Sequence, residues 1–295
     1  MDWRIRMAKL AIIGRIPFGD HARRAKRRVF GYSPDKENLL GTLRDLDQMQ
    51  AALSELGRSF SGATVLEIGS GWFPTIPITL AVRGAKRVLM SDLVPHMDEV
   101  TFAATLKFLV ENTQAQPRRT TESRIEDFPL TYLAPFRIAD VADQSIDFII
   151  SRTVLEHIPR TALIDLLRAL RPKISPQGLM LHLVDHSDHL EHADKSLSKV
   201  NFLTWSNRKH ALVNWLTKEG ENRLRHHQYQ QVFDEAGYGI AQFSTQLHEP
   251  TRALVKTLKL VAPFRGMTPD EISILSSLFV LSPRTKVNPK FETII

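Results

Sequence analysis

The stretch Thr64-Val65-Leu66-Glu67-Ile68-Gly69-Ser70-Gly71-Trp72 decides the fold of this chain. Residues 64–68 are a short apolar run with β-branched side chains, which predicts a buried strand. Gly69 and Gly71 let the backbone turn tightly and let a ligand approach the main chain closely. Residues 74–82 predict a helix with proline in its first turn. A strand, a glycine turn and a helix in this order predict a ligand site at the carboxyl end of a central strand in an open α/β sheet.

An acid in this strand argues against a pyrophosphate ligand. Dinucleotide folds carry Gly-x-Gly-x-x-Gly, but Pro74 stands at the third glycine position here. Glu67 lies two residues before the first glycine, where its carboxylate would repel a pyrophosphate. A cationic ligand that carries an amino acid is favoured instead. We expect S-adenosylmethionine, which has a sulfonium, an ammonium and no phosphate, to be bound by Glu67, Gly69, Ser70 and Gly71.

Two further segments carry polar residues to the same edge of the sheet. Residues 87–91 predict the second strand, and Asp92 follows it, about 20 residues beyond the glycine turn. A carboxylate in this place suits a ribose diol as a paired hydrogen-bond acceptor. Residues 145–151 predict another buried strand, which runs into a short helix, Leu155-Glu156-His157-Ile158.

In this order and spacing, the three segments resemble class I S-adenosylmethionine-dependent methyltransferases over residues 39–283. The resemblance implies an α/β, Rossmann-like sheet of seven strands, six parallel and the last antiparallel, with helices on both faces. It implies methyl transfer as the reaction, with Ser151 and Arg152 lining the methionine side of the cofactor. Many relatives place an acid for the adenine just after the third strand. Arg137 stands there, and Asp140, three residues later, is the candidate for this contact.

Length and composition limit the class of protein. The chain has 295 residues, of which 43% are hydrophobic, and this fits one large domain with insertions or an arm. No apolar run is long enough to cross a bilayer or to form a signal-peptide core. The chain has no cysteine, which excludes disulfides, cysteine metal sites and methyl transfer to cytosine C5. We expect a cytoplasmic protein.

The formal net charge of +7 belongs to an N-terminal arm. Residues 1–28 hold nine Lys and Arg and two Asp, so the remaining chain is neutral. Trp3, Met7 and Leu10 share one helical face of this arm. Two interpretations stay open: a segment that contacts an anionic membrane or acceptor, or a solvated helix packed on the domain. We expect a basic arm, a methyltransferase domain and a tail, over residues 1–35, 36–285 and 286–295.

The best place for a general base follows the fifth predicted strand, residues 179–184. Asp185, His186 and His189 should fall at the carboxyl edge of the sheet, beside the expected methyl group. A histidine titrates near neutrality and could take a proton from a hydroxyl, while the aspartate orients its ring. A solvated polar loop is one alternative. A metal site is the last alternative, and we expect none; its ligands would come from His182, His186, His189, His192 and nearby aspartates.

Residues 186–226 are an insertion before the next core helix, which we expect to act as a lid. Aromatic rings stack on sugars, and amide and guanidinium groups bind hydroxyls or phosphate, so Trp205, Asn222 and Arg223 are expected to bind substrate. The runs Asp-x-x-Asp-His, Asn-Phe-Leu and Asn-Arg-Leu-Arg are similar to methyltransferases associated with bacterial surface-polysaccharide synthesis. The alternative is a lid whose tryptophans belong to the core.

The C-terminal part predicts a helix and a short strand. Thr268-Pro269-Asp270-Glu271 is a capping box with proline at the first helical position, and its helix should run to about Ser277. Residues 278–281 should form the last strand.

The function expected from these features is methyl transfer to a sugar hydroxyl in a glycan or glycolipid precursor. The arm would contact the inner face of the membrane peripherally. Three alternatives remain: a methyltransferase acting on nucleic acid, one acting on a small molecule, and a non-catalytic cofactor-binding scaffold. Against nucleic acid, the segment after the fourth strand lacks the Asp/Asn-Pro-Pro-aromatic motif that grips an exocyclic amine.

Overall fold

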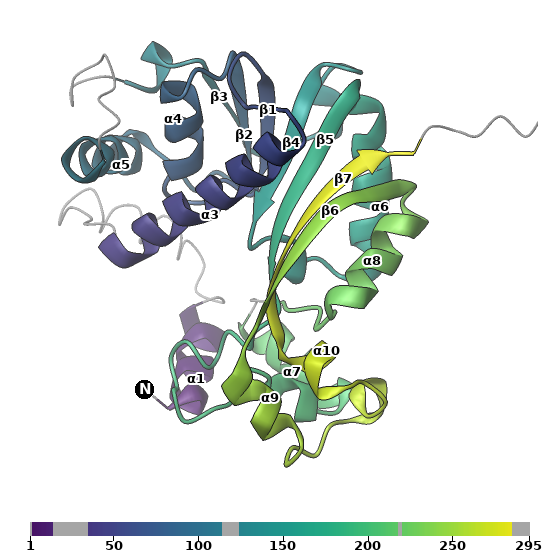
Figure 1. The fold of residues 1–295 in the computed structure, drawn as a ribbon. Helices are drawn as coiled ribbons and strands as arrows, with labels where there is room; N and C mark the ends of the chain where they lie inside the picture. The colour runs from purple at the N-terminus through teal and green to yellow at the C-terminus, as the bar shows by residue number, and fades with distance from the viewer. Residues whose placement is uncertain (1, 14–34, 114–123, 218–219, 285–295) are drawn as a thin grey trace, which may run out of the picture.

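One seven-stranded sheet organises the structure, a computed structural model that describes residues 2–13, 35–113, 124–217 and 220–284. The strand order is β3-β2-β1-β4-β5-β7-β6 (Figure 1). The strands are β1 Thr64–Ile68, β2 Arg87–Ser91, β3 Leu130–Leu133, β4 Ile146–Arg152, β5 Ile174–Asp185, β6 Tyr238–Leu247 and β7 Ile274–Pro283. The pairings among β1 to β5 are parallel, whereas β7 pairs antiparallel with β5 and with β6. The sheet is therefore mixed, and antiparallel pairing involves both of the last two strands rather than one.

Helices cover both faces of this sheet, as expected. On one face the apolar side chains of the strands pack against α3 Lys36–Glu55 and α4 Thr75–Val82, with α5 Glu99–Asn112 outside them. On the other face they pack against α6 Arg160–Leu170 and α8 His226–Glu235. No helix in the described ranges is both long enough and apolar enough to span a membrane. Short 3-10 turns complete the sheet domain at Ile125–Asp127, Ile138–Asp140, Leu155–His157 and Arg171–Lys173.

A second apolar cluster lies beyond the end of β5, below the sheet in Figure 1. We call the part of the structure built around this cluster the lobe. The lobe comprises the described residues of three segments, 3–13, 186–225 and 248–273. Its helices are α1 Trp3–Ile13, α7 Asn207–Thr217, α9 Glu249–Val255 and α10 Pro269–Ser273, with 3-10 turns at Asn201–Thr204 and Ala262–Phe264. The predicted lid is thus only one of three segments that build this unit.

The β6–β7 connection is the segment that the sequence did not indicate. β6 and β7 have ten residues each and continue past the sheet as a ribbon that carries 248–273 into the lobe (Figure 1). The helix expected to reach Ser277 ends at Ser273, because Ser276 and Ser277 pair with both β5 and β6. Tertiary strand pairing overrides the local helix signal here.

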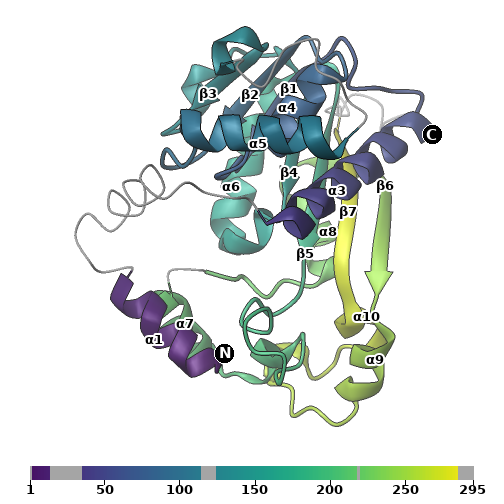
Figure 2. The ribbon, with the colours of Figure 1, turned by 90° about the vertical axis from the view of Figure 1, so that its left-hand side faces the viewer.

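α1 packs on the lobe through the face that the sequence indicated. Trp3 and Met7 contact the apolar cluster, and the Trp3 ring lies 5.6 Å from the Trp205 ring. The ammonium of Lys209 in α7 lies 5.6 Å from the Trp3 ring and 4.4 Å from the Trp205 ring. Figure 2 shows α1 beside α7. Of the two interpretations of the arm, the packed helix describes α1, while the side chain of Leu10 and the rest of the arm lie outside the described residues.

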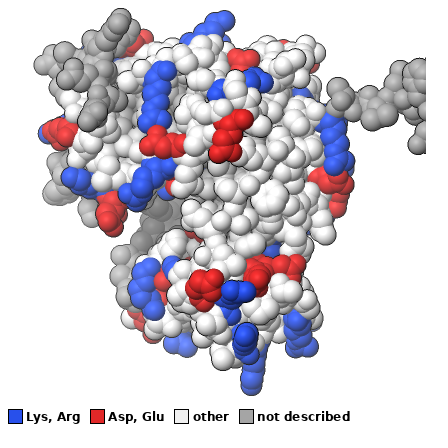
Figure 3. Space-filling model, in the orientation of Figure 1, with Lys and Arg blue, Asp and Glu red and all other residues white. Residues whose placement is uncertain are grey.

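Charge on the domain surface is mixed. On the face seen in Figure 3, basic and acidic side chains of the described residues are interspersed. This agrees with a chain whose excess of positive charge lies in its first 28 residues.

Candidate active site

The glycine turn after β1 is held by the neighbouring strand β2. The amides of Gly69 and Ser70 donate to the carbonyl of Ser91, at 2.8 and 3.1 Å. Gly69 and Gly71 have φ angles of 76° and 67°, a conformation that glycine adopts without strain. A Cβ on Gly69 would lie 2.5 Å from Cγ2 of Val154, so the position also lacks room for a side chain. Gly69 is required by both conformation and space.

A cavity of about 370 Å³ lies at the carboxyl ends of β1 and β4. β2 and β4 lie on opposite sides of β1, and a crevice is expected at such a change of direction in an α/β sheet. The walls are the glycine turn, the start of α3 and the residues after β4; they include Asn38, Thr42, Glu67, Ser70, Arg152 and Val154. Its size is within the range of small-molecule sites.

Glu67 is the buried acid of this cavity. The residue is 4% exposed, and its Oε2 has no hydrogen-bond partner in the described ranges. Burial raises the pKa of Glu67 to about 7; the charge of Asp92 adds to this, while the Ser70 hydroxyl and Arg152 oppose it. A buried carboxylate with an unsatisfied oxygen suits the ammonium of an amino-acid ligand. With the close approach at Gly69, the residues therefore fit S-adenosylmethionine.

Asp92 follows β2, as the sequence indicated. The amide of Gly71 donates to both carboxylate oxygens at 3.1 Å, and the hydroxyl of Tyr132 donates to Oδ2 at 2.9 Å. Burial raises the pKa of Asp92, and these two hydrogen bonds oppose the rise. An ionised carboxylate accepts about four hydrogen bonds, so capacity for a ribose hydroxyl remains. Tyr132 was missed, because a tyrosine inside a predicted strand indicates only core packing.

Of the other three cofactor candidates, one lines the cavity and two do not. Arg152 lines the cavity and pairs with Asp45 of α3 at 2.6 Å. Ser151 does not line it; the hydroxyl is buried and lies 2.8 Å from Nδ1 of His182. Asp140 pairs with Arg137 and lines a separate cavity near the starts of β1, β2 and β4, at the opposite ends of the strands. The structure thus does not support an adenine contact for Asp140.

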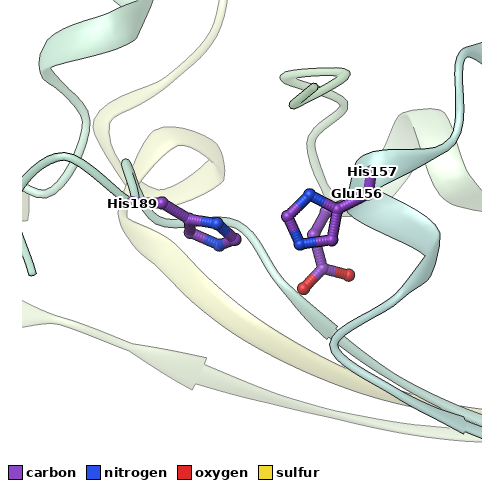
Figure 4. Close-up of side chains that lie close together, drawn as sticks. All are labelled: Glu156, His157 and His189. Atoms are coloured by element: carbon purple, nitrogen blue, oxygen red, sulfur yellow. The ribbon is translucent and has the colours of Figure 1, made fainter. Parts of the chain in front are cut away.

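A group of acids and histidines gathers where β4 and β5 end; Figure 4 shows three of its members. We call it the His189 cluster: Glu156, His157, Asp185, His189 and Glu221. The Nδ1 of His189 lies 3.3 Å from Oε1 of Glu221, and its Nε2 lies 3.6 Å from Oδ2 of Asp185. The ring centroids of His157 and His189 are 4.9 Å apart. The predicted Asp185–His189 pair forms, and two glutamates join it.

The charges of the cluster balance each other. Burial alone would raise the pKa of Asp185, but hydrogen bonds from His189 and Ser187 hold it at about 2. Burial alone would lower the pKa of His189, but Asp185 and Glu221 raise it to about 9. Burial raises the pKa of Glu156 and of Glu221 to about 8 each. His189 therefore holds its proton at neutral pH between two acids.

His186 is not available to a substrate, contrary to expectation. The residue is 2% exposed, its Nδ1 lies 3.1 Å from the carbonyl of Leu224, and its Nε2 lies 2.9 Å from the hydroxyl of Ser277. Both ring nitrogens serve internal hydrogen bonds that join β5, β7 and the approach to α8. The structure therefore does not support a catalytic role for His186.

The three predicted substrate residues make contacts within the chain instead. Trp205 is 5% exposed in the core of the lobe. Asn222 donates to two backbone carbonyls of the loop after β4, at 2.8 and 2.9 Å. Arg223 is buried and donates to two lobe carbonyls, at 3.1 and 2.8 Å. The Trp205 ring is buried, and the side chains of Asn222 and Arg223 donate within the chain, so the structure does not support sugar binding by these residues.

A mixed sheet of this order, with a glycine turn after β1, an acid after β2 and a cavity at the switch of strand order, is typical of the Rossmann-like methyltransferase fold. A family model described as "Methyltransferase domain" matches residues 42–242, and the chain belongs to this family. The protein is an S-adenosylmethionine-dependent methyltransferase, and S-adenosylmethionine is its cofactor.

Solved structures of low sequence identity are similar to the chain. An S-adenosylmethionine-dependent methyltransferase from Mesorhizobium loti is 17% identical, with 78% of this chain and 95% of that chain covered and a TM-score of 0.46. Magnesium protoporphyrin IX methyltransferase from Synechocystis PCC 6803 with bound SAH is 15% identical, with 93% and 100% covered and a TM-score of 0.49. A search of curated proteins finds no match.

Binding of S-adenosylmethionine is expected to weaken as the pH falls through about 7. Glu67 has a pKa of about 7, so it is ionised above this pH and neutral below it. The neutral acid no longer attracts the cationic cofactor, so the affinity for the cofactor falls as Glu67 takes up its proton. Calorimetric titrations across this range measure the effect. Glu67→Gln should bind weakly at every pH, and a wild-type affinity that is flat across the range would exclude Glu67 as a cofactor contact.

Proposed function

We propose that the enzyme methylates a hydroxyl of a sugar in a glycan or glycolipid precursor. The observation in favour of an oxygen acceptor is the position of the His189 cluster. Its residue Glu156 follows the cavity residue Val154 by two positions, and Asp185 ends the adjacent strand β5. Carboxylates and imidazoles form hydrogen bonds with hydroxyls and accept their protons.

The cofactor supplies a methyl group on a sulfonium, and its transfer to a hydroxyl leaves one proton to be removed. Asp185 and Glu221 hold the His189 ring from both sides. This fixes the orientation of the ring. Because His189 is already protonated, the ionised carboxylate of Asp185 is the group that takes up the hydroxyl proton, which transfer of the methyl group makes strongly acidic. Alignment and exclusion of water supply most of the rate in such a reaction.

The sugar part of the proposal rests on the sequence runs after β5 and on the lobe. The lobe lies beside the carboxyl end of β5 (Figure 2), and in this proposal it contacts part of a large acceptor. With Trp205 in the core, Trp215 of α7 is the aromatic residue that lies at the surface of the lobe, and it is 64% exposed. An exposed indole suits stacking on a sugar face.

Transfer of a labelled methyl group tests the acceptor. The protein is incubated with methyl-labelled S-adenosylmethionine and separate lipid, glycan, RNA, DNA and small-metabolite extracts, and we expect alkali-stable label in the glycan or lipid fraction. His189→Ala and Asp185→Asn should lower turnover about a hundredfold. His192→Asn is the matched control, because its ring lies 5.3 Å from His189 outside the cluster. Label in nucleic acid or small metabolites, or cofactor binding without transfer, would favour the corresponding alternative.

We also propose a cytoplasmic location with peripheral contact between the arm and the inner face of the membrane. Trp3 and Met7 pack on the lobe, so the contact would rely on basic side chains such as that of Arg4, which is 71% exposed. Each basic residue contributes about 1 kcal/mol near an anionic surface. We expect sedimentation with anionic vesicles at low salt and release at high salt. Protein that stays in the supernatant at low salt would refute the contact.

A further inference from the structure

We propose that Glu156, His157 and His189 bind a divalent transition-metal ion, with zinc as the first candidate. One ligand atom from each side chain lies within 4.8 Å of the other two (Figure 4). Zinc bonds to nitrogen and oxygen of about 2.0–2.2 Å place ligand atoms roughly 3.4 Å apart, so side-chain rotations have at most about 1.4 Å to close. The inference concerns binding of the ion and does not depend on which acceptor is methylated.

The buried carboxylate of Glu156 is the feature that indicates a bound ion. The residue is 4% exposed, and neither of its carboxylate oxygens has a hydrogen-bond partner in the described ranges. The amides of Glu156 and Asp185 act on the carboxylate electrostatically but form no hydrogen bond of acceptable geometry with it. A buried polar group without a partner is costly and rare. A metal ion at this place would satisfy the carboxylate directly.

Both histidines already have the partners that metal-bound histidines require. Such a histidine donates its second ring N–H to a carboxylate or a backbone carbonyl, which fixes its tautomer. The Nδ1 of His157 lies 2.9 Å from the carbonyl of Gly220, so Nδ1 carries the proton and Nε2 the lone pair. The nitrogens of His189 face Glu221 and Asp185. Binding of the ion displaces the proton from one nitrogen of His189, and an acid remains to orient the other nitrogen.

The donor set matches zinc chemistry. Two imidazoles and one carboxylate form the ligand set of many catalytic zinc sites, and they leave a fourth position for water or substrate oxygen. Imidazole favours zinc, copper, iron and nickel over magnesium and calcium. The acids Asp185 and Glu221 compensate the charge of a dication, and the chain has no cysteine to compete for it.

This set differs from the metal alternative in the sequence, which drew on His182, His186, His189 and His192. The rings of His182 and His186 are buried away from this group, and His192 is not one of its three ligands, so His189 is the shared member. Glu156 and His157 come from the turn after β4, next to β5 in the sheet. The proposal departs from the expectation of no metal and places the ion at a site that spans two strand ends.

Titration of the tag-free, full-length protein with zinc chloride tests the proposal. We expect one ion per chain, and Glu156→Gln and His157→Asn should each weaken binding more than about tenfold. His192→Asn, with its ring 5.3 Å from His189 and outside the ligand set, should bind as the wild type does. Cobalt should give visible bands of nitrogen and oxygen coordination without a thiolate charge-transfer band, because the chain has no cysteine.

S-adenosylmethionine binding by each variant provides the control for folding. Loss of zinc with intact cofactor binding supports the site. No zinc binding by the wild type, or equal binding by wild type and Glu156→Gln, would overturn it, and the cluster would then be balanced by the proton on His189 alone. Failure of the proposed acceptor leaves these readouts unchanged, so the two proposals fail separately.

Discussion

Replacing Asp92 with alanine is expected to weaken S-adenosylmethionine binding about tenfold to a hundredfold. A charge-assisted hydrogen bond contributes about 1.5–3 kcal/mol, and about 1.4 kcal/mol corresponds to a factor of ten. The structure adds a second loss in the same direction. The Gly71 amide, at 3.1 Å, and the Tyr132 hydroxyl, at 2.9 Å, would lose their acceptor, so the glycine turn would be less well held. Calorimetry measures the affinity.

Two variants separate these effects from general damage. Tyr132→Phe removes one hydrogen bond to Asp92 and keeps the carboxylate, so its effect on affinity should be smaller. Asp98→Ala is the matched control: its Oδ1 accepts from the Thr101 amide at 3.0 Å and caps α5. Loss of this cap costs about 1 kcal/mol of stability and should leave cofactor affinity unchanged. Unchanged affinity in Asp92→Ala would remove Asp92 from the cofactor site.

Replacing Arg225 with alanine should lower the free energy of unfolding by about 3 kcal/mol or more. The side chain is fully buried, and its guanidinium donates to the carbonyls of His186, Ile272 and Ile274, at 2.6, 2.9 and 2.6 Å. Each buried carbonyl left without a donor costs about 1–3 kcal/mol. These carbonyls lie in the loop after β5 and at the junction of α10 with β7, so the variant would loosen the connection between the sheet and the lobe.

Denaturant titration measures this loss, and Arg225→Lys should be intermediate because an ammonium cannot reproduce the planar fork. Arg252→Ala is the control: Arg252 pairs with Asp270 on the surface, and such pairs contribute about 0–1 kcal/mol. Because His186 follows Asp185 directly, Arg225→Ala should also disturb the His189 cluster and reduce turnover. A variant with wild-type stability would show that water replaces the guanidinium at no cost.

The cofactor half of the site could be predicted from the sequence because its parts are local. A strand, a glycine turn and a helix are continuous in the chain, and a positive φ at Gly69 has a direct sequence signature. Glu67 and Asp92 sit at fixed offsets from this turn, so their chemistry and their edge of the sheet could be stated together. The adenine contact predicted for Asp140 is not supported, because the position of Asp140 depends on a loop that lies at the opposite ends of the strands.

The His189 cluster, where the proposed function places the acceptor, was decided by tertiary structure. Glu156, Asp185 and Glu221 come from three separate segments, and only the β4–β5 pairing and the path of the lobe bring them to His189. His186 and His189 looked alike in the sequence, but Asp185 pairs with Ser276 of β7 at the end of the ladder and His186 then enters the interior. Sequence periodicity specifies which side chains share a strand face. The burial of a loop residue depends instead on what packs over it, and here β7, α8 and the lobe determine which histidine is buried.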